Sequence, residues 1–151
     1  MEPRVSTRTR ARLDEYATFH RTLGNEVCHF VGIPLIVAGA GRLFAAVPLF
    51  ALGSAELTLT ELVLLAVAAF YVIEARGLGL VTAVIIVLLA ELARLLPFYW
   101  GLALFLVGWA VQFIGHARFE HRSPAFLGNL VHLLVGPAWL VERAVRRERA
   151  A

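Results

Sequence analysis

The chain has 151 residues, of which 60% are hydrophobic, and its mean hydropathy is +0.76. Soluble domains are about 45–50% apolar, so this excess indicates that lipid rather than water surrounds much of the surface. The formal net charge is +3 and every basic residue is arginine, but the arginines form no block long enough to predict a nucleic-acid interface. A single cysteine excludes an intrachain disulfide and any multi-cysteine metal site within one chain.

An amphipathic helix is predicted over residues 9–24. Leu13, Tyr16 and His20 recur at three- and four-residue spacing, which places them on one face of such a helix. Because this face is the apolar one, His20 is expected to point into the protein rather than into solvent. The helix is expected to end at Gly24.

Four apolar segments follow, and we predict that each crosses a membrane as a helix. About 20 predominantly apolar residues suffice to span the hydrocarbon core of a bilayer. The four segments are residues 27–52, 57–73, 78–96 and 99–115. Tyr99 and Trp100 begin the last of them, as residues of an interfacial aromatic belt do.

The C-terminal part of the chain is less apolar. A polar stretch, HARFEHRSPA, starts at His116, and a moderately apolar segment follows over residues 126–141. Gly136-Pro137 interrupts this segment, and a proline inside a helix removes a backbone donor and clashes with the preceding turn. We therefore predict re-entrant or interfacial helices here rather than a fifth crossing, with a basic tail after them.

The expected fold is an all-α integral membrane protein with about four transmembrane helices. It forms a single membrane domain over 1–151, made of an N-terminal arm (1–26), a four-span bundle (27–115) and a C-terminal part (116–151). Five arginines precede Cys28 and six follow Gly115, whereas the turn between the first two spans has none. Because arginine accumulates on the cytoplasmic side, both termini are expected to face the cytoplasm, which requires an even number of spans. The compact, arginine-only chain favours a bacterial inner membrane.

The five histidines, His20, His29, His116, His121 and His132, all avoid the second and third spans. His20 and His29 flank the start of the first span, and His116 and His121 follow the end of the fourth. With an even number of spans, these two places lie at the same membrane face. Residues far apart in the sequence are therefore predicted to converge.

This convergence predicts a metal site. Polar groups at membrane depth are costly and tend to be functional, and imidazole binds iron, copper, nickel and zinc. We take His20, His29 and His116 as the ligands and His132 as a further candidate. For His121 and His132 taken singly, the more frequent alternative is an amphipathic side chain at the headgroup level.

Other polar residues surround the predicted site. Gln112, His116 and Glu120 are four apart in sequence, so they form one stripe at the end of the fourth span. Glu120 is a candidate ligand or a group that orients a ligand, whereas Gln112 and Asn25 are candidate hydrogen-bond donors behind the ligands. Gly115 allows another backbone to approach closely.

Three arginines lie beside the histidines in sequence. Arg21, Arg118 and Arg122 could each receive an acidic head group, because a guanidinium matches the geometry of a carboxylate. We take them, together with Tyr16, as candidate substrate-binding residues.

Three stretches resemble the signatures of a known family. YATFHRTLGNEVCHFVGIPLI is similar to the pattern Y-x-x-x-H-x-x-x-x-N-x-x-x-H-x-x-G-x-P-L, and WAVQFIGHARFEHRSPAF is similar to W-x-x-Q-F-x-G-H-x-x-x-E-x-x-x-P-A. LLVGPAWLVE resembles a closing G-P motif. Together they resemble the fungal-type endoplasmic-reticulum 2-hydroxy fatty acid dioxygenases, over essentially the whole chain. The family's histidines match His20, His29 and His116, and its acid matches Glu120.

The resemblance implies an oxygenase that uses Fe(II) and O2, without 2-oxoglutarate or haem. Its substrate would be a long-chain 2-hydroxy acid, cleaved between C1 and C2 to the acid one carbon shorter, as in fatty acid α-oxidation. Membrane lipid would surround the enzyme, and the sequence leaves room for a homo-oligomer. Two alternatives stay open. One is a haem-binding or electron-transfer protein, since histidines on different helices can ligate haem; the other is a non-enzymatic membrane scaffold or carrier.

Overall fold

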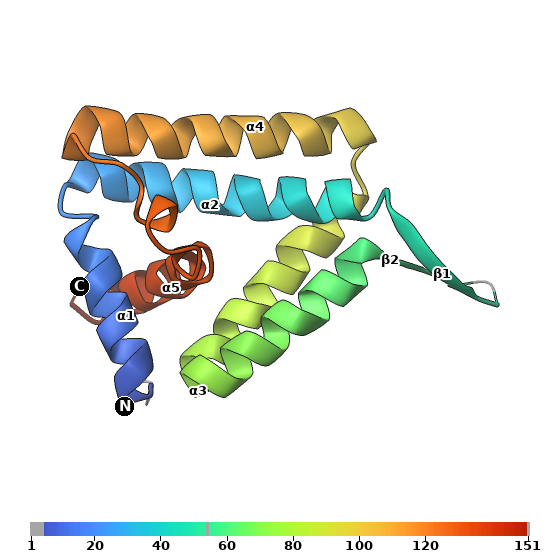
Figure 1. Cartoon of the computed structure of the whole chain (residues 1–151), viewed down its shortest axis with the longest axis horizontal. Helices are drawn as coiled ribbons and strands as arrows, with labels where there is room; N and C mark the ends of the chain where they lie inside the picture. The colour runs from blue at the N-terminus through green and yellow to red at the C-terminus, as the bar shows by residue number, and fades with distance from the viewer. Residues whose placement is uncertain (1–4, 54, 151) are drawn as a thin grey trace.

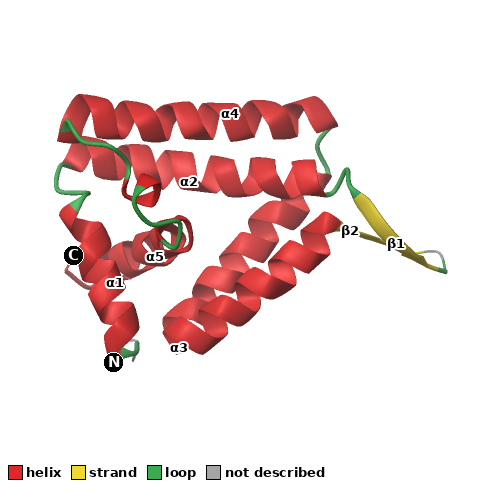
Figure 2. Ribbon diagram, in the orientation of Figure 1, coloured by secondary structure: helices red, strands yellow, loops and turns green. Residues whose placement is uncertain are grey.

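The computed structural model describes residues 5–53 and 55–150. Helices make up most of it (Figures 1 and 2). The elements in chain order are α1 (Thr7–Thr18), α2 (Leu23–Phe44), β1 (Pro48–Leu52), β2 (Ala55–Thr58), α3 (Leu59–Arg94), α4 (Phe98–Gly115), the π-helical turn η1 (His116–Glu120), the 3₁₀ turn η2 (Ala125–Leu127) and α5 (His132–Ala150). The all-α prediction is confirmed, with one short β-hairpin in addition.

The helices α2 and α4 lie side by side along the long axis of the molecule (Figure 1). Glycines seven residues apart form the contact on both helices. A Cβ added to Gly108 would lie 2.8 Å from the carbonyl oxygen of Gly32, and one added to Gly39 would lie 2.8 Å from that of Gly101. The two backbones therefore touch, which is a common way for helices to associate in a membrane, where small residues permit close approach.

The same contact fixes which ends of α2 and α4 meet. A Cβ added to Gly115, the last residue of α4, would lie 2.5 Å from Oδ1 of Asn25, in the first turn of α2. A Cβ added to Gly24 would lie equally close to the ring of Phe119. The start of the first apolar helix and the end of the last one are therefore neighbours, as an even number of crossings requires.

The helix α3 explains how this antiparallel arrangement arises. Its 36 residues would extend about 54 Å if straight, well beyond the thickness of a hydrocarbon core. It folds back instead at Arg76, where φ is 47° and ψ is −121°, so that its two limbs lie next to each other (Figure 1). Among the described residues, α2, α3 and α4 with η1 are the helices long and apolar enough to cross a membrane. The limbs of α3 correspond to the predicted spans 57–73 and 78–96.

The first predicted span, 27–52, extends beyond the end of the helix that the structure shows. The helix α2 ends at Phe44, and β1 pairs with β2 in an antiparallel hairpin. Proline at position 48 disfavours helical geometry for the residue before it, so the helix cannot continue. Gly53, with φ at 62°, supplies the left-handed residue in the connection between the strands.

The predicted helices at the two ends of the chain also differ from the structure. The helix α1 ends at Thr18 rather than Gly24, because α2 already begins at Leu23, with the hydroxyl of Thr22 accepting from the N–H of Asn25 at its N-terminus. At the other end, α5 runs through Pro137 without a break. The prediction that Gly136-Pro137 interrupts the helix was therefore wrong. One continuous helix stands where two were predicted.

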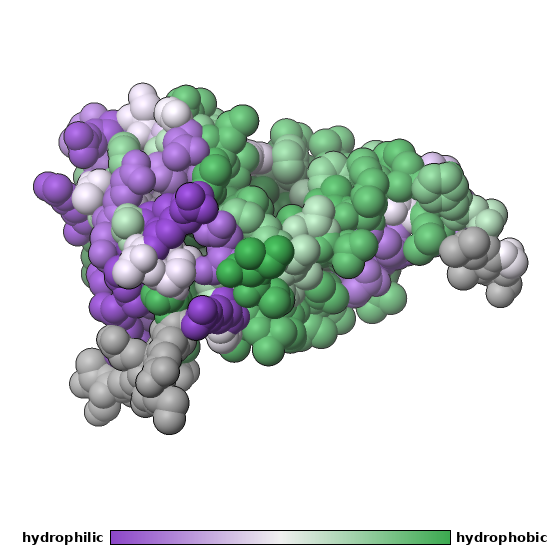
Figure 3. Space-filling model, turned by 60° about the horizontal axis from the view of Figure 1, so that its bottom comes forward, coloured by the Kyte–Doolittle hydropathy of each residue, from purple (hydrophilic) through white to green (hydrophobic). Residues whose placement is uncertain are grey.

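Polar residues gather at one end of the molecule. Figure 3 shows hydrophilic side chains over α1 and its surroundings, and apolar ones over the long helices. Ion pairs tie this end together: Arg10 to Glu142 at 2.5 Å, and Arg12 to Glu74 at 2.9 Å. Since Glu74 lies in the turn of α3, that turn is at the same end as α1. The long helices between the ends of the molecule expose mostly apolar side chains, with Leu65 70% exposed on α3, as expected of a face in contact with lipid.

Candidate metal centre

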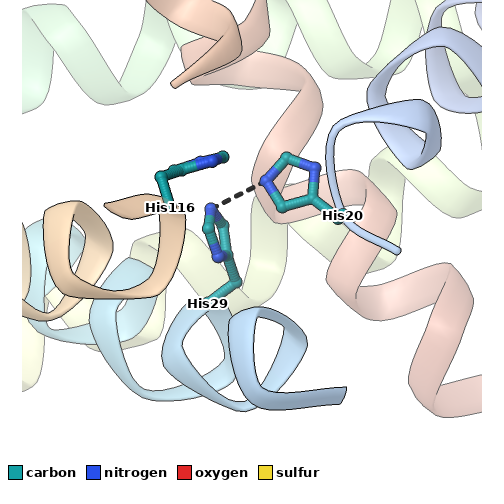
Figure 4. Close-up of side chains that lie close together, drawn as sticks. All are labelled: His20, His29 and His116. Atoms are coloured by element: carbon teal, nitrogen blue, oxygen red, sulfur yellow. Dashed lines mark hydrogen bonds between the residues drawn. The ribbon is translucent and has the colours of Figure 1, made fainter. Parts of the chain in front are cut away.

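Three histidines from separate segments meet at the polar end. His20 lies in the connection between α1 and α2, His29 lies in the first turns of α2, and His116 begins η1 (Figure 4). One ring nitrogen of each lies within 4.8 Å of the others. All three side chains are buried, with at most 4% of each residue exposed. Such a cluster in one place is what a metal site requires.

The hydrogen bonds of two of these rings determine where their protons are. Nδ1 of His20 lies 2.7 Å from the carbonyl oxygen of Tyr16, and Nδ1 of His29 lies 2.9 Å from that of Asn25. A carbonyl oxygen can only accept, so each Nδ1 carries the proton and donates it. The lone pair of each neutral imidazole is therefore on Nε2.

These two lone pairs face each other. Nε2 of His20 and Nε2 of His29 are 2.8 Å apart, the contact drawn in Figure 4. A hydrogen bond between them would need a second proton on one ring, but burial lowers the pKa of His20 to about 4 and so favours its neutral form. A cation held between the two nitrogens satisfies both lone pairs. The donor set therefore fits a metal ion, and the backbone carbonyls act as the groups that orient ligating histidines.

His116 completes the group. Its Nδ1 is buried and has no hydrogen-bond partner among the described residues. A buried polar nitrogen without a partner is costly, so in a native protein it calls for a bound ion, a ligand or an ordered water. The π-helical turn that starts at His116 is itself a feature found frequently at functional sites.

A cavity of about 180 Å³ adjoins the three histidines. Most of its lining is apolar, but Tyr16, Gln112 and His132 also reach it. Nε2 of Gln112 and both ring nitrogens of His132 are buried without a hydrogen-bond partner in the described part of the chain. Nε2 of His132 lies 3.6 Å from a carboxylate oxygen of Glu15, beyond hydrogen-bond distance. The cavity thus offers unused polar groups beside the histidines.

Tyr16 holds one of the histidines in place. Its ring stacks on that of His20, with centroids 4.1 Å apart and planes 15° apart. Burial raises the pKa of Tyr16 well above its usual value, so its hydroxyl stays protonated. Trp139, from the closing G-P motif, lies against the same imidazole with centroids 5.3 Å apart. Trp139 was not among the predicted site residues, although it lies within the closing G-P motif.

The structure gives Glu120 a positioning role. Its Oε1 accepts from the backbone N–H groups of Arg21 and Thr22 and from the Thr22 hydroxyl, each at 2.8 Å. The carboxylate thereby anchors the connection that carries His20, and it is outside the group of converging ring nitrogens. Asn25 contributes a backbone carbonyl to His29, and its side-chain amide donates to the carbonyl of Phe19 at 3.3 Å.

The predicted substrate-binding arginines lie elsewhere. Arg21, Arg118 and Arg122 are exposed, and none of them lines the histidine cavity. The guanidinium of Arg122 lies over the ring of Phe19, 5.7 Å from its centroid. Their positions therefore do not support a direct contact with a ligand in the cavity. His121 is also exposed and ends η1 with φ at 51°.

Comparison with known proteins assigns the chain to a family. Residues 6–148 match the family described as 2-hydroxy-palmitic acid dioxygenase Mpo1-like. The chain is 31% identical over 131 residues to the 2-hydroxy-palmitic acid dioxygenase MPO1 of Saccharomyces cerevisiae (strain ATCC 204508 / S288c), an alignment that covers 83% of this chain and 72% of the yeast protein. No solved structure matches. The family match spans nearly all of the chain, including all three histidines, and the chain belongs to the Mpo1-like family.

Proposed function

We propose that this chain is an Fe(II)-dependent dioxygenase that shortens long-chain 2-hydroxy acids by one carbon. The observation that carries the proposal is the pair of facing Nε2 lone pairs on His20 and His29, with His116 beside them. The yeast relative, which is named as a 2-hydroxy-palmitic acid dioxygenase, supports the substrate class and the use of O2.

The proposed reaction calls for a redox-active metal, and the family resemblance favours iron. Three imidazoles accept iron, copper, nickel or zinc, so the ligands alone do not decide among them. Zinc has no redox chemistry and cannot take part in the reduction of O2. Bound iron would supply the one-electron steps by which O2 reacts with a closed-shell organic acid. His20, His29 and His116 are the residues that would hold it.

The reaction balances without a further reductant. A 2-hydroxy acid and one O2 give the acid one carbon shorter, one CO2 and one H2O. The bond between C1 and C2 breaks, and C2 becomes the new carboxyl carbon. The substrate supplies all four electrons that O2 accepts. The chain therefore needs no electron-transfer partner for this chemistry.

The cavity residues would orient the head of the substrate. The amide of Gln112 can donate a hydrogen bond, the hydroxyl of Tyr16 can donate or accept one, and the two ring nitrogens of His132 offer further hydrogen-bonding atoms. All three line the histidine cavity, where a carboxylate and its neighbouring hydroxyl would find them. Since the rest of the lining is apolar, these polar contacts would form in surroundings of low dielectric constant, where they gain strength.

The membrane position is part of the proposal. The arginine distribution favours a cytoplasmic location for both termini and hence for the polar end that carries the histidines. In a bacterium the membrane would be the inner one. A 2-hydroxy acid in the adjoining leaflet would reach the site with its head group at the interface and its tail in the lipid.

The two alternative functions fit the geometry less well. Axial ligation of haem by His20 and His29 would require the porphyrin to pass between two nitrogens that are 2.8 Å apart, where it has no room. A non-enzymatic scaffold or carrier gives no reason for three buried imidazoles to converge or for unpaired polar groups to line a cavity. A Soret band in the purified protein would revive the haem alternative.

Turnover is the experiment that tests the function. Protein purified anaerobically and loaded with Fe(II) is expected to convert 2-hydroxypalmitic acid to the 15-carbon acid, with one O2 consumed per product. Palmitic acid, which lacks the hydroxyl, should not be consumed, and protein loaded with Zn(II) should be inactive. Consumption of O2 without a shortened acid, or no reaction with any 2-hydroxy acid, would refute the proposal. Activity with copper and none with iron would show that the proposed metal is wrong, while the proposed reaction would stand.

A further inference from the structure

Three cavities meet at one pair of side chains, Val37 in α2 and Pro137 in α5. The first is the histidine cavity of about 180 Å³. The second, of about 330 Å³, lies between α2, α3 and α5, and the third, of about 130 Å³, lies deeper between the same helices. Val37 and Pro137 line all three cavities. Ile33 also lines both the first and the second. Only a few apolar side chains therefore separate the histidines from the larger apolar space.

The chemistry of the lining changes across this boundary. All the histidines of the cluster lie on the near side. On the far side, Thr82 is the one polar residue lining the 330 Å³ cavity among the described residues, and its hydroxyl already donates to the carbonyl of Leu78 at 2.8 Å. This cavity therefore offers a ligand only apolar contacts, and it suits a hydrocarbon tail.

The same cavity extends toward the lipid. Val81 and Ile85 line it from α3, and they are 49% and 40% exposed on the outer surface. The 130 Å³ cavity is different, because Tyr71 and Ala90, which line it and not the larger cavity, are both buried in the core. Of the two spaces beyond Val37, the 330 Å³ cavity is thus the larger and the one continuous with a lipid-facing surface.

We propose that the acyl chain of the 2-hydroxy acid runs from the histidine cavity past Val37 and Pro137 into the 330 Å³ cavity, and that Val37 controls which chain lengths are accepted. This inference rests on the proposed function. It adds a specificity-determining residue and a path for the tail. The head of the acid lies at the histidines, and the tail passes between α2 and α5 toward the lipid-facing side of α3.

The residues at the junction suit a passage of fixed width. Valine is branched at Cβ, so its side chain has one strongly preferred rotamer in a helix and does not move aside easily. Proline at position 137 is also rigid, because its ring fixes the backbone angle φ and closes its side chain on the main chain. A larger side chain at position 37 would therefore narrow the passage directly.

Replacement of Val37 by phenylalanine tests the path. For the wild type, kcat/KM referred to the concentration of the free acid in water is expected to rise about fourfold with each added methylene from the 8-carbon acid upward, until the tail fills the cavity. For Val37→Phe the rise should stop at a shorter chain, so that the ratio of kcat/KM for the 16-carbon acid to that for the 8-carbon acid falls at least tenfold. Val31→Phe is the matched control, because Val31 lies on the same helix and is 49% exposed. Its dependence of kcat/KM on chain length should match that of the wild type.

The outcomes separate this inference from the proposed function. If the wild type converts 2-hydroxy acids and Val37→Phe keeps the wild-type length profile, the path is wrong and the function stands. If the wild type converts none of them, the function fails. Equilibrium binding of radiolabelled 2-hydroxy acids of graded length to the wild type and to Val37→Phe then tests the path. The affinities are expected to depend on chain length as described for kcat/KM. Should Val37→Phe fail to fold, Val37→Ala must shift the preference to longer acids, and an unchanged preference would overturn the inference.

Discussion

Replacing His29 with alanine is expected to abolish metal binding while the helical fold is retained. Loss of a partner that merely orients a ligand typically costs about 10–100-fold in metal affinity, so loss of a ligand should cost at least 100-fold. The metal-free protein should not be destabilised in proportion, because the substitution also removes a lone pair that faces the Nε2 of His20 at 2.8 Å. Iron content after anaerobic loading and the helical signal in circular dichroism measure the two effects.

Thermal unfolding provides a second readout of the same variant. A ligand at one hundred times its dissociation constant stabilises a folded protein by about 2.7 kcal/mol. The melting temperature of the wild type should therefore rise with added Fe(II), and that of His29→Ala should not. His121→Ala, at an exposed histidine near the cluster, is the control and should respond like the wild type. An equal rise in His29→Ala would remove this residue from the ligands.

Replacing Gly108 with leucine is expected to remove metal binding without touching a histidine. A Cβ at this position would lie 2.8 Å from the carbonyl oxygen of Gly32 and 2.7 Å from the side chain of Ile36. A backbone carbonyl cannot turn aside within a helix, so α2 and α4 must separate. Because α2 carries His29 and the end of α4 leads into His116, their separation pulls the two imidazoles apart.

The stability of the same variant should fall as well. Overpacking a well-packed contact costs about 1–3 kcal/mol, and a clash between two backbones belongs at or above the upper end of this range. Gly77→Leu is the matched control, since a Cβ there meets nothing within 4 Å. Iron content and melting temperature should fall together in Gly108→Leu and stay near the wild-type values in Gly77→Leu. A Gly108→Leu protein that loads iron normally would show that the glycine contact does not hold the site.

The convergence of the three histidines was predictable because it depends on the number and order of the apolar segments and not on their exact ends. It requires only that the apolar segments be counted correctly and that the chain return to the face where it began. The fold of α3 satisfies this requirement, since its turn at Arg76 converts one long helix into two limbs. The exact helix ends did not matter: His20 reaches the cluster although α1 stops at Thr18, because its ring still bonds to the carbonyl of Tyr16.

The finer features depend on contacts that spacing does not reveal. The role of Glu120 depends on two N–H groups that are free only because α2 starts at Leu23, and the predicted helix would have used them internally. The β-hairpin was missed because a short apolar run is compatible with either a helix or a strand. The helix α5 passes through Pro137 because its packing against α1 and α3 outweighs the lost hydrogen bond.

The iron content and ligation of the wild-type protein test the central claim most directly. We predict that protein purified anaerobically and reconstituted with Fe(II) holds one iron per chain, with X-ray absorption showing imidazole nitrogen ligands that are lost when His20, His29 and His116 are replaced together. Protein that takes up no iron would contradict a metal centre at these residues. So would iron whose spectrum is unchanged in the triple variant.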